Sequence, residues 1–469
     1  NGGDAIVAGS TITAKGLGVG VQGEDSAFVG IGVDVAVESS GRDRYHQNPA
    51  TGILVEDKGK ALLVGGSVQA SGRGATGVVV SGSGSLFSAF GTEIDAAGND
   101  STSMRISKGA NAILVNSQVQ GSGEGIDVSK GAHLGVIGGS VAATGSHGVA
   151  VSISGNDSAA VMMGTDLTAG GRDGVAVDVR GAGQAYLKDS NLNARGVGLQ
   201  ADGRGTSVVS VGSTIVAGSD SEPNVRRFRS DPSVGVAASN GAKVALIGGS
   251  VEALGDGSVG ARAAGARILA DGVDISASGT NATAVLAQQA ETSHGHGRDR
   301  HALSSQIAVI GSTVSTTGAG AVAVKANGKR SAVFVDDSTV TTAGQGSYGV
   351  VSEDGGKVVL NNSTVNVSGE GTAAARVQSD TSWHNREVSG LYVNGSDLTA
   401  AGENSAGIEL QNSGNVYLKD STVSATGASL ASKLDRGYQT QNIVVGSGAT
   451  LVDNNGTLLQ VNRSGDSGS

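Results

Sequence analysis

One short motif recurs along this chain, and its recurrence constrains the fold more than any other feature of the sequence. The motif appears as GSTITAKG, GGSVQASG, GGSVEALG and DSTVSATG, each with an aliphatic residue at its centre. Eleven of the 16 spacings between successive central residues are 22–26 residues. A constant period of this length indicates a solenoid, because each repeat buries its apolar face against its neighbours. The 17 central residues are Ile12, Val35, Val68, Ile94, Val119, Val141, Leu167, Leu192, Ile215, Val251, Ile275, Val314, Val340, Val365, Leu398, Val423 and Leu458.

Each repeat contains three short runs in which apolar residues alternate with polar or small ones. The repeat that contains Val141 reads GGSVAATG, GVAVSI and AAVMMG. Alternation over four or five residues predicts strands, and Gly, Ser, Asn and Asp between the runs predict turns. We therefore predict an all-β fold, a right-handed parallel β-helix of three-strand coils with about 17 rungs and protruding loops. Every central aliphatic residue should point inward, and the outward residues should be mostly Ser, Thr, Asn and Gly.

Composition agrees with a solenoid and excludes several functional classes. The 469 residues exceed the size of one ordinary globular core, and aromatic residues are only 3% of the chain, so the interior must be filled by small aliphatic side chains. The net formal charge of −10 argues against a nucleic-acid partner. The absence of Cys excludes disulfides, thiol catalysis and Cys-based zinc sites. We expect no cofactor, and residues 1–469 should form a single β-helix region.

Five spacings in the repeat are too long, at 33, 36, 39, 33 and 35 residues, and each contains an insertion. The insertions hold all three Pro residues and the only Trp, and they are dense in Arg. Arg and aromatic residues dominate the binding energy of protein interfaces, and insertions in solenoids often form a binding face. The alternative is that these are solvated surface loops. The candidate partner-binding residues are Arg42, Arg44, Tyr45, Arg226, Arg227, Phe228, Arg229, Arg298, Arg300, Trp383, Arg386 and Tyr438.

The phase of the repeat divides the insertions into two sets. We count the strand that carries the central aliphatic residue as the first strand of a coil. The insertions around Tyr45, Phe228 and Tyr438 should follow this first strand, and those around His296 and Trp383 should follow the second strand. We expect each set to project from its own edge of the coil. The strongest single anchor is the segment 226–229, since its three arginines can meet an acidic patch and Phe228 can fill a pocket.

Residues that could carry catalysis or bind a metal are scattered. Asp34, Asp166, Asp274 and Asp397 occupy matching positions but in distant repeats, so we interpret them as turn-capping acids. Asp336 and Asp337 are adjacent and should point to different sides of a strand. The run 294–301, HGHGRDRH, has no zinc-ligand spacing, and its arginines oppose a cation. The terminal GDSGS lacks the context of a serine-protease nucleophile. We predict no catalytic and no metal-binding residue.

The repeat strings GGSVQASGRGATGVVV and NGAKVALIGGSVEALG resemble those of the passenger domains of pertactin-like autotransporters. In style they are most similar to the serum-resistance branch and to the member that captures complement C1 inhibitor. The resemblance implies a signal peptide, export across the outer membrane and a C-terminal translocator barrel. We expect both the signal peptide and the barrel to be absent from this chain, so that it is a passenger region attached to the outer membrane only through that barrel.

The leading hypothesis is therefore a secreted or surface-exposed bacterial virulence factor that binds a host protein through its inserted loops. The resemblance favours complement evasion by capture of a host complement regulator, with complement C1 inhibitor as the candidate partner. The chain should be monomeric and not an enzyme. Two alternatives stay open: an adhesin for host cells or matrix, and a glycan-degrading β-helix enzyme. A carboxylate cluster across neighbouring coils would favour the enzyme, and protruding Arg-rich loops would favour binding.

Overall fold

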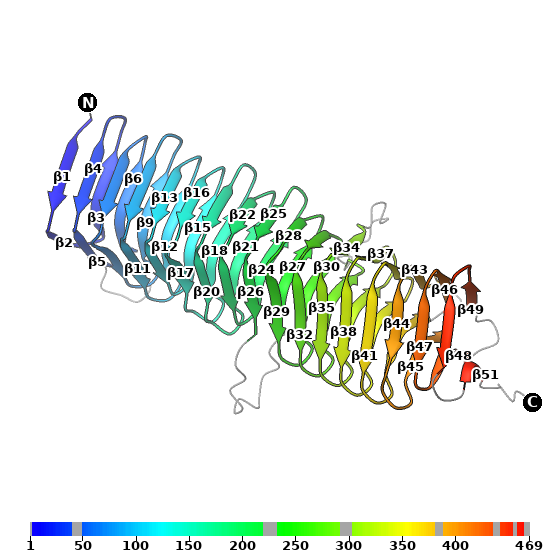
Figure 1. Cartoon of the computed structure of the whole chain (residues 1–469). Helices are drawn as coiled ribbons and strands as arrows, with labels where there is room; N and C mark the ends of the chain where they lie inside the picture. Colours follow the sequence, from blue (N-terminus) through cyan, green and yellow to red (C-terminus); the bar gives the residue numbers. More distant parts are fainter. Residues whose placement is uncertain are drawn as a thin grey trace, which may run out of the picture. The chain divides into compact units, whose positions relative to one another are not determined.

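The structure is a computed structural model, and it describes residues 2–39, 49–218, 232–290, 303–379, 388–434, 441–453 and 457–463. These residues form 51 strands and no helix (Figure 1). Within them there is accordingly no helix long and apolar enough to cross a membrane. The chain divides into two compact units, Asn1–Asp231 and Pro232–Ser469, and the strands of each unit form three sheets, called here A, B and C in chain order.

The first unit begins with β1 and ends with β26. Its sheet A contains β1 (Asp4–Ala8), β4 (Ala27–Ile31), β7 (Lys60–Val64), β10 (Leu86–Phe90), β13 (Asn111–Val115), β16 (His133–Ile137), β19 (Ala159–Met163), β22 (Gln184–Lys188) and β25 (Ser207–Val211). Its sheet B contains β2 (Thr11–Lys15), β5 (Asp34–Glu38), β8 (Ser67–Ser71), β11 (Glu93–Ala97), β14 (Gln118–Gly121), β17 (Ser140–Ala143), β20 (Asp166–Ala169), β23 (Asn191–Ala194) and β26 (Thr214–Ala217). Its sheet C contains β3 (Leu17–Gln22), β6 (Thr51–Glu56), β9 (Thr76–Ser81), β12 (Thr102–Ser107), β15 (Glu124–Ser129), β18 (Val149–Ser154), β21 (Val175–Arg180) and β24 (Val197–Asp202).

The second unit begins with β27 and ends with β51. Its sheet A contains β28 (Lys243–Ile247), β31 (Arg267–Asp271), β34 (Ser305–Ile310), β37 (Ser331–Asp336), β40 (Lys357–Asn361), β43 (Gly390–Asn394), β46 (Gly414–Lys419) and β49 (Gln441–Val445). Its sheet B contains β29 (Ser250–Leu254), β32 (Asp274–Ser278), β35 (Thr313–Thr317), β38 (Thr339–Ala343), β41 (Thr364–Ser368), β44 (Asp397–Ala400), β47 (Thr422–Ala425) and β50 (Thr450–Asp453). Its sheet C contains β27 (Val234–Ser239), β30 (Val259–Ala264), β33 (Thr283–Gln288), β36 (Val322–Asn327), β39 (Tyr348–Glu353), β42 (Ala373–Ser379), β45 (Ala406–Asn412), β48 (Ala428–Leu434) and β51 (Thr457–Arg463).

Within each unit, strands three places apart along the chain pair in parallel, and equivalent residues of successive coils lie side by side. In the second unit, Val251 lies beside Ile275, Ile275 beside Val314, and Val314 beside Val340. This register confirms the three-strand coil and the parallel β-solenoid that the repeat predicted, with about 17 coils in all. The right-handed sense of the coil stays a prediction.

The central aliphatic residues form the core of sheet B. Fifteen of the 17 are buried, with at most 1% of the residue exposed. Ile12 lies in the first coil and is half-buried. The prediction was wrong for Leu458, which lies in β51 of sheet C and is 51% exposed; Leu451 of β50 lies beside Val423 and takes the central position instead. Alternating apolar residues are common to all three strands of a coil, so the string GTLLQVN matches the motif without belonging to sheet B.

The interior of the coil leaves little room near sheet C, and this explains part of the high glycine content of the chain. A Cβ atom on Gly77 would lie 2.6 Å from the carbonyl oxygen of Ser103 and 2.9 Å from a methyl group of Ile94. Such distances are far inside van der Waals contact, so only glycine fits there without a shift of the neighbouring coil.

A column of buried serines joins successive coils at the turn from sheet A to sheet B. The amide of Ser312 donates to Oγ of Ser338 (3.1 Å), and the amide of Ser338 donates to Oγ of Ser363 (3.2 Å). The residue before Ser338, Asp337, has a φ of 46°, in the left-handed region that Gly, Asn and Asp tolerate best. Asp337 is thus a turn residue that directly follows the last residue of β37, Asp336.

Candidate functional site

All twelve predicted partner-binding residues lie outside the described residues. They belong to the segments 40–48, 219–231, 291–302, 380–387 and 435–440. Segment 40–48 joins β5 to β6, and segment 219–231 follows β26 of sheet B. Segments 291–302 and 380–387 join sheet C to sheet A, after β33 and after β42. Sheet B contains the predicted first strand of each coil and sheet C the second, so these four connections lie where the repeat predicted.

The fifth connection corrects the predicted phase. Segment 435–440, which contains Tyr438, joins β48 of sheet C to β49 of sheet A. Tyr438 therefore belongs with Trp383 and His296, after the second strand, and not with Tyr45 and Phe228. The error has the same origin as that at Leu458, since counting back from Leu458 moves the final coil out of phase.

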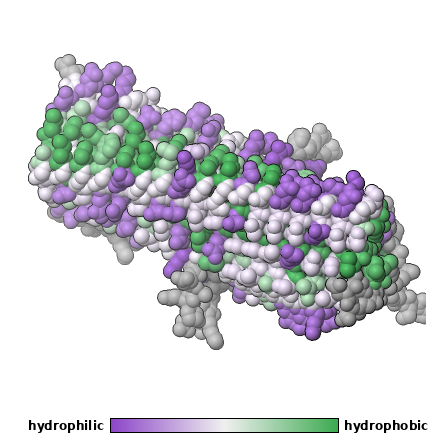
Figure 2. All heavy atoms as spheres, viewed as in Figure 1, coloured by the Kyte–Doolittle hydropathy of each residue, from purple (hydrophilic) through white to green (hydrophobic). Residues whose placement is uncertain are grey.

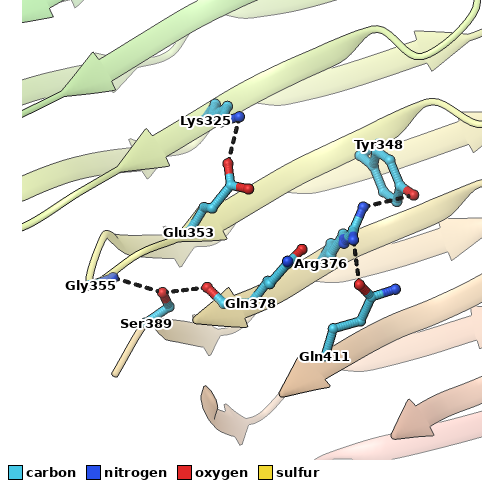
Figure 3. A network of polar contacts seen from close by, with 8 residues as sticks. All are labelled: Lys325, Tyr348, Glu353, Gly355, Arg376, Gln378, Ser389 and Gln411. Carbon is cyan, nitrogen blue, oxygen red and sulfur yellow. Dashed lines mark hydrogen bonds and ion pairs between the residues drawn. The ribbon is translucent and has the colours of Figure 1, made fainter. Parts of the chain in front are cut away.

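Buried hydroxyl groups fix the chain where segment 380–387 leaves and rejoins the solenoid. Ser379 and Ser389 flank the segment and are both buried, with their Oγ atoms 2.8 Å apart. The amide of Ser389 donates to Oγ of Ser379 (2.7 Å), and Oγ of Ser389 donates to the carbonyl oxygen of Gln378 (2.7 Å). Ser389 also accepts a hydrogen bond from the amide of Gly355 in the previous coil (3.0 Å; Figure 3).

The same arrangement recurs at the base of segment 291–302. Oγ of Ser305, also buried, donates to the carbonyl oxygen of Gln288 (2.5 Å) and accepts from the amide of Gly265 (2.7 Å). At the base of segment 40–48, Oγ of Ser39 donates to the carbonyl oxygen of Ser71 (3.1 Å) and accepts from the amide of Ala50 (3.3 Å). The insertions thus start from positions fixed in the solenoid, which reduces the entropy that their ends lose on binding.

A row of charged side chains lies on the outer face of sheet C in the second unit, beside the base of segment 380–387 (Figure 3). Lys325 and Glu353, from β36 and β39, form an ion pair of 2.6 Å. The guanidinium group of Arg376, from β42, lies 5.0 Å from the ring centroid of Tyr348 and donates to its hydroxyl group (3.1 Å). It also donates to Oε1 of Gln411 and lies 3.8 Å from a carboxylate oxygen of Glu409.

Arg376 is held on several sides but keeps unused hydrogen-bonding capacity. Its Nε–H is buried without a hydrogen-bond partner, although the Glu409 carboxylate lies nearby. Sequence reasoning missed this row because single charges at alternate positions of a strand resemble an ordinary solvated face. The available signal was the recurrence of a charge at one coil position, in KAN, RVQ and ELQ of the repeats that contain β36, β42 and β45.

Sheet C of the first unit carries a group of acids that sequence reasoning also missed. Asp127 of β15 pairs with Arg105 of β12 (3.4 Å), and Asp178 of β21 pairs with Arg180 of the same strand (2.7 Å). Burial raises the pKa of Glu124, Asp127 and Asp178, and the arginines offset part of the rise. Carboxyl groups with raised pKa values in nearby coils are what the enzyme hypothesis requires.

The accessibility of these acids opposes a catalytic role. The Asp178 side chain is only 4% exposed, and Arg180 forms two contacts with it, at 2.8 and 2.7 Å. A substrate would have to displace the arginine first. Asp34 and Asp166, which the sequence singled out, are exposed and accept hydrogen bonds from Ser67 and Asn191 of the next coils. Within the described residues, no group of three His, Asp or Glu side chains could hold a metal ion.

The outer face of sheet A contradicts the expectation of a polar solenoid surface. Ile113, Ile137 and Val161 of the first unit point outward and are 41–46% exposed. In the second unit, Tyr392 and Tyr417 are stacked with ring centroids 5.0 Å apart and line a hollow of about 380 Å³ together with Val359 and Val444. Consecutive apolar residues, as in NAILV, were the signal for this face, because both sides of such a strand are apolar.

Comparison with known proteins gives a match at the level of structure. No protein family model matches the chain, and no curated protein matches it. A solved structure described as the cryo-EM structure of the Vag8–C1 inhibitor complex matches with a TM-score of 0.56 and 18% sequence identity. The match covers 98% of this chain and 100% of that one. The alginate lyase AlyGC of family PL6 matches with a TM-score of only 0.23 and 11% identity, over 98% and 96% of the two chains. The chain therefore shares the β-solenoid fold of the matched Vag8 structure, which agrees with the fold that the resemblance of its repeats implied.

Proposed function

We propose that this chain is the passenger region of a bacterial autotransporter, secreted or exposed at the cell surface, and that it binds a host protein through its inserted segments. The observation that carries the proposal is the position of the twelve Arg and aromatic residues. All of them lie in five segments that interrupt a solenoid with the fold of Vag8. Hydrogen bonds from serines fix the bases of three of these segments in the solenoid, with buried serines at two of them, which favours preorganised binding.

Complement C1 inhibitor is the partner that we propose. Vag8 is seen in complex with C1 inhibitor, and the two chains match over almost their full lengths. Capture of this regulator would remove it from its own targets and would serve complement evasion. The arginines of the insertions stand out in a chain whose net charge is −10, so an acidic patch on the partner would meet a local excess of positive charge.

A binding measurement with purified C1 inhibitor tests the proposal. The segment 226–229 concentrates three arginines around Phe228, so the double change Arg227→Ala with Phe228→Ala should remove the main anchor. Loss of a buried charged anchor costs about 2–5 kcal/mol, so the Kd should rise by at least about 30-fold. Surface plasmon resonance on the immobilised chain measures this change.

Arg195→Ala is the matched control, since Arg195 is an exposed arginine of the solenoid itself. It should leave the Kd unchanged. If the double variant binds as tightly as the unchanged chain, segment 219–231 is not the anchor. If the unchanged chain does not bind C1 inhibitor, the proposed partner is wrong, and capture from human serum would then identify another host protein.

A second candidate function, glycan cleavage, is favoured by the raised pKa values of Glu124, Asp127 and Asp178. We expect no activity, because the carboxylates of Asp127 and Asp178 each form an ion pair with an arginine. Incubation with host glycosaminoglycans, followed by detection of new reducing ends, tests this expectation. Turnover that Asp178→Asn abolishes, in a variant that still folds, would establish the enzyme and displace the binding proposal as the leading function.

A further inference from the structure

The outer face of sheet A in the first unit is apolar over nine consecutive strands. Its outward side chains form two columns that run across the strands, one residue per coil. The first column contains Ile6, Val29, Leu62, Ser88, Ile113, Gly135, Val161, Tyr186 and Val209. The second column contains Ala8, Ile31, Val64, Phe90, Val115, Ile137, Met163, Lys188 and Val211. Eight of the large apolar residues in these columns are 36–76% exposed, and the face forms a hydrophobic band in Figure 2.

The solenoid fold does not require such a face. In the second unit, the second column of sheet A is largely polar, with Asp271, Asp336, Asn361, Asn394 and Lys419 in successive or nearby coils. Sheet B of the first unit presents outward residues such as Gln120 and Thr168, both exposed. The first column of sheet A in the second unit is apolar too, with Leu269, Phe334, Tyr392 and Tyr417, so only the combination of two apolar columns is particular to the first unit. An exposed apolar patch of this extent marks a binding surface.

We propose that the first unit pairs with a second copy of this chain through the outer face of its sheet A, in place of the monomer expected from the sequence. The repeat of the surface favours this partner. Side-chain rows on the face follow one another at the spacing of parallel strands, about 4.8 Å, and a second copy presents rows with the same period. The rows of one copy can therefore fit the grooves of the other along the whole face. A partner of unrelated shape would match the period only by chance.

The size of the face reaches what a stable pair needs. Nine strands span roughly 40 Å, and two columns with their side chains span roughly 14 Å, which gives about 560 Å² on each copy. Two copies would bury about 1,100 Å², just above the roughly 1,000 Å² expected of a specific interface. Sheets commonly pack face to face about 10 Å apart with interdigitated side chains, so the geometry is an ordinary one.

The composition of the face opposes other partners. Its side chains are mostly aliphatic, whereas sugar rings are bound by exposed aromatic faces and hydrogen-bonding groups. The neighbouring outward column contains one Lys, Lys60, and no Arg, which is too little positive charge to attract an anionic membrane surface. The only charged residue inside the two columns is Lys188, near one end. This pairing goes beyond the proposed host-protein binding and does not depend on it.

The oligomeric state of the full chain tests the proposal. Sedimentation velocity at micromolar concentration should show a dimer. Ile113→Glu combined with Val161→Glu should weaken the dimer by at least about 100-fold, because it buries charges without partners at the centre of the face. The matched control is Gln120→Glu with Thr168→Glu, which places the same charges on sheet B of the same coils. This control should remain dimeric, and both variants should keep the circular dichroism spectrum of the unchanged chain.

A cysteine scan then locates the contact, because the chain has no Cys of its own. Single substitutions Val64→Cys, Phe90→Cys, Val115→Cys and Ile137→Cys follow one column, and at least one should form an interchain disulfide under mild oxidation. Gln120→Cys on sheet B should not. A monomeric unchanged chain would overturn the proposal, as would a dimer that survives the double glutamate change. Flotation with phosphatidylcholine vesicles that the same change abolishes would assign the face to lipid and also overturn it.

Discussion

At the scale of single residues, the period of the repeat and the small space inside each coil determine which side chains point inward. Val251 is 1% exposed and lies beside Ile275 of the next coil. Because successive coils place the same residue type in the same column, the identity of each inward position is predictable from the repeat alone. The outward positions have no such constraint, which is why their chemistry could not be read with the same certainty.

Val251→Asp should be severely destabilising. The change buries a carboxylate that has no partner in an aliphatic column, at a cost of at least about 3 kcal/mol. Urea unfolding of the full chain, followed by circular dichroism, measures the loss. Glu252→Ala is the control, since Glu252 is the next residue and is exposed; it should change the free energy of unfolding by less than about 0.5 kcal/mol. A Val251→Asp chain as stable as the control would contradict an inward position.

Ser389→Ala should loosen the base of segment 380–387. The hydroxyl group of Ser389 is buried and connects Gly355, Gln378 and Ser379, so its removal leaves buried polar groups without their partner. A loss of about 1–3 kcal/mol in the free energy of unfolding is expected. Ser315→Ala, at a half-buried outward position of sheet B, should have a much smaller effect. Equal effects of the two changes would show that the Ser389 hydroxyl group does not hold the base of segment 380–387 in place.

At the scale of strands and sheets, the three faces of each coil differ, and the sequence revealed this only in part. Sheet B has outward Ser, Thr and Asn residues, as expected, together with Gln69 and Gln120. Sheet A has apolar residues on both sides, which the run AAVMM already contained as five consecutive apolar residues. Sheet C has half-buried charges such as Asp127 and Arg376, whose pairing depends on which coils lie side by side. That pairing is a property of register between repeats, and single strands do not encode it.

The buried acids of sheet C predict a pH dependence of stability in the first unit. Burial raises the pKa of Asp178, so the folded chain holds its proton to a higher pH than the unfolded chain does. This contribution to stability is complete below the ordinary pKa of Asp and is lost as the pH rises through the raised pKa. Asp178→Asn removes the titrating group. The variant should therefore gain stability relative to the unchanged chain as the pH rises from about 3.5 to about 7, by about 1.4 kcal/mol per unit of the pKa shift.

Urea titrations of both chains over this pH range check the prediction. Gln120→Ala serves as the control, since Gln120 is exposed, lies in sheet B and carries no titrating group. Its difference from the unchanged chain should be nearly independent of pH. If the Asp178→Asn chain instead loses relative stability with rising pH, the ion pair with Arg180 outweighs the cost of burial, and the pKa of Asp178 is lowered.

At the scale of the whole chain, the fold could be predicted directly from the repeat. The candidate binding site could be predicted only as the set of segments that do not fit the repeat. Regular repeats account for nearly all the described residues, and every interruption longer than a turn coincides with a segment rich in Arg or aromatic residues. Segment 435–440 shows the limit of this reasoning, because Leu451 and Leu458 match the motif equally well and only the pairing with Val423 decides between them. Which of the five segments contact one another or a partner depends on side chains for which no periodic pattern exists.

Removal of all five insertions separates the solenoid from its proposed function. Segments 40–48, 219–231, 291–302, 380–387 and 435–440 would each be replaced by a short Gly-Asn turn, like those that join the same sheets in the regular coils. Loop closure costs little, and the coils on either side already pair in register, so the shortened chain should keep its β-sheet circular dichroism spectrum and its resistance to urea. Its affinity for C1 inhibitor should fall below detection by surface plasmon resonance. Restoring segment 219–231 alone should recover more of that affinity than restoring 40–48 alone, because segment 219–231 holds four consecutive candidate residues, 226–229. Full affinity without any insertion would mean that the partner recognises the solenoid surface itself, and the charged row around Arg376 would then be the place to look.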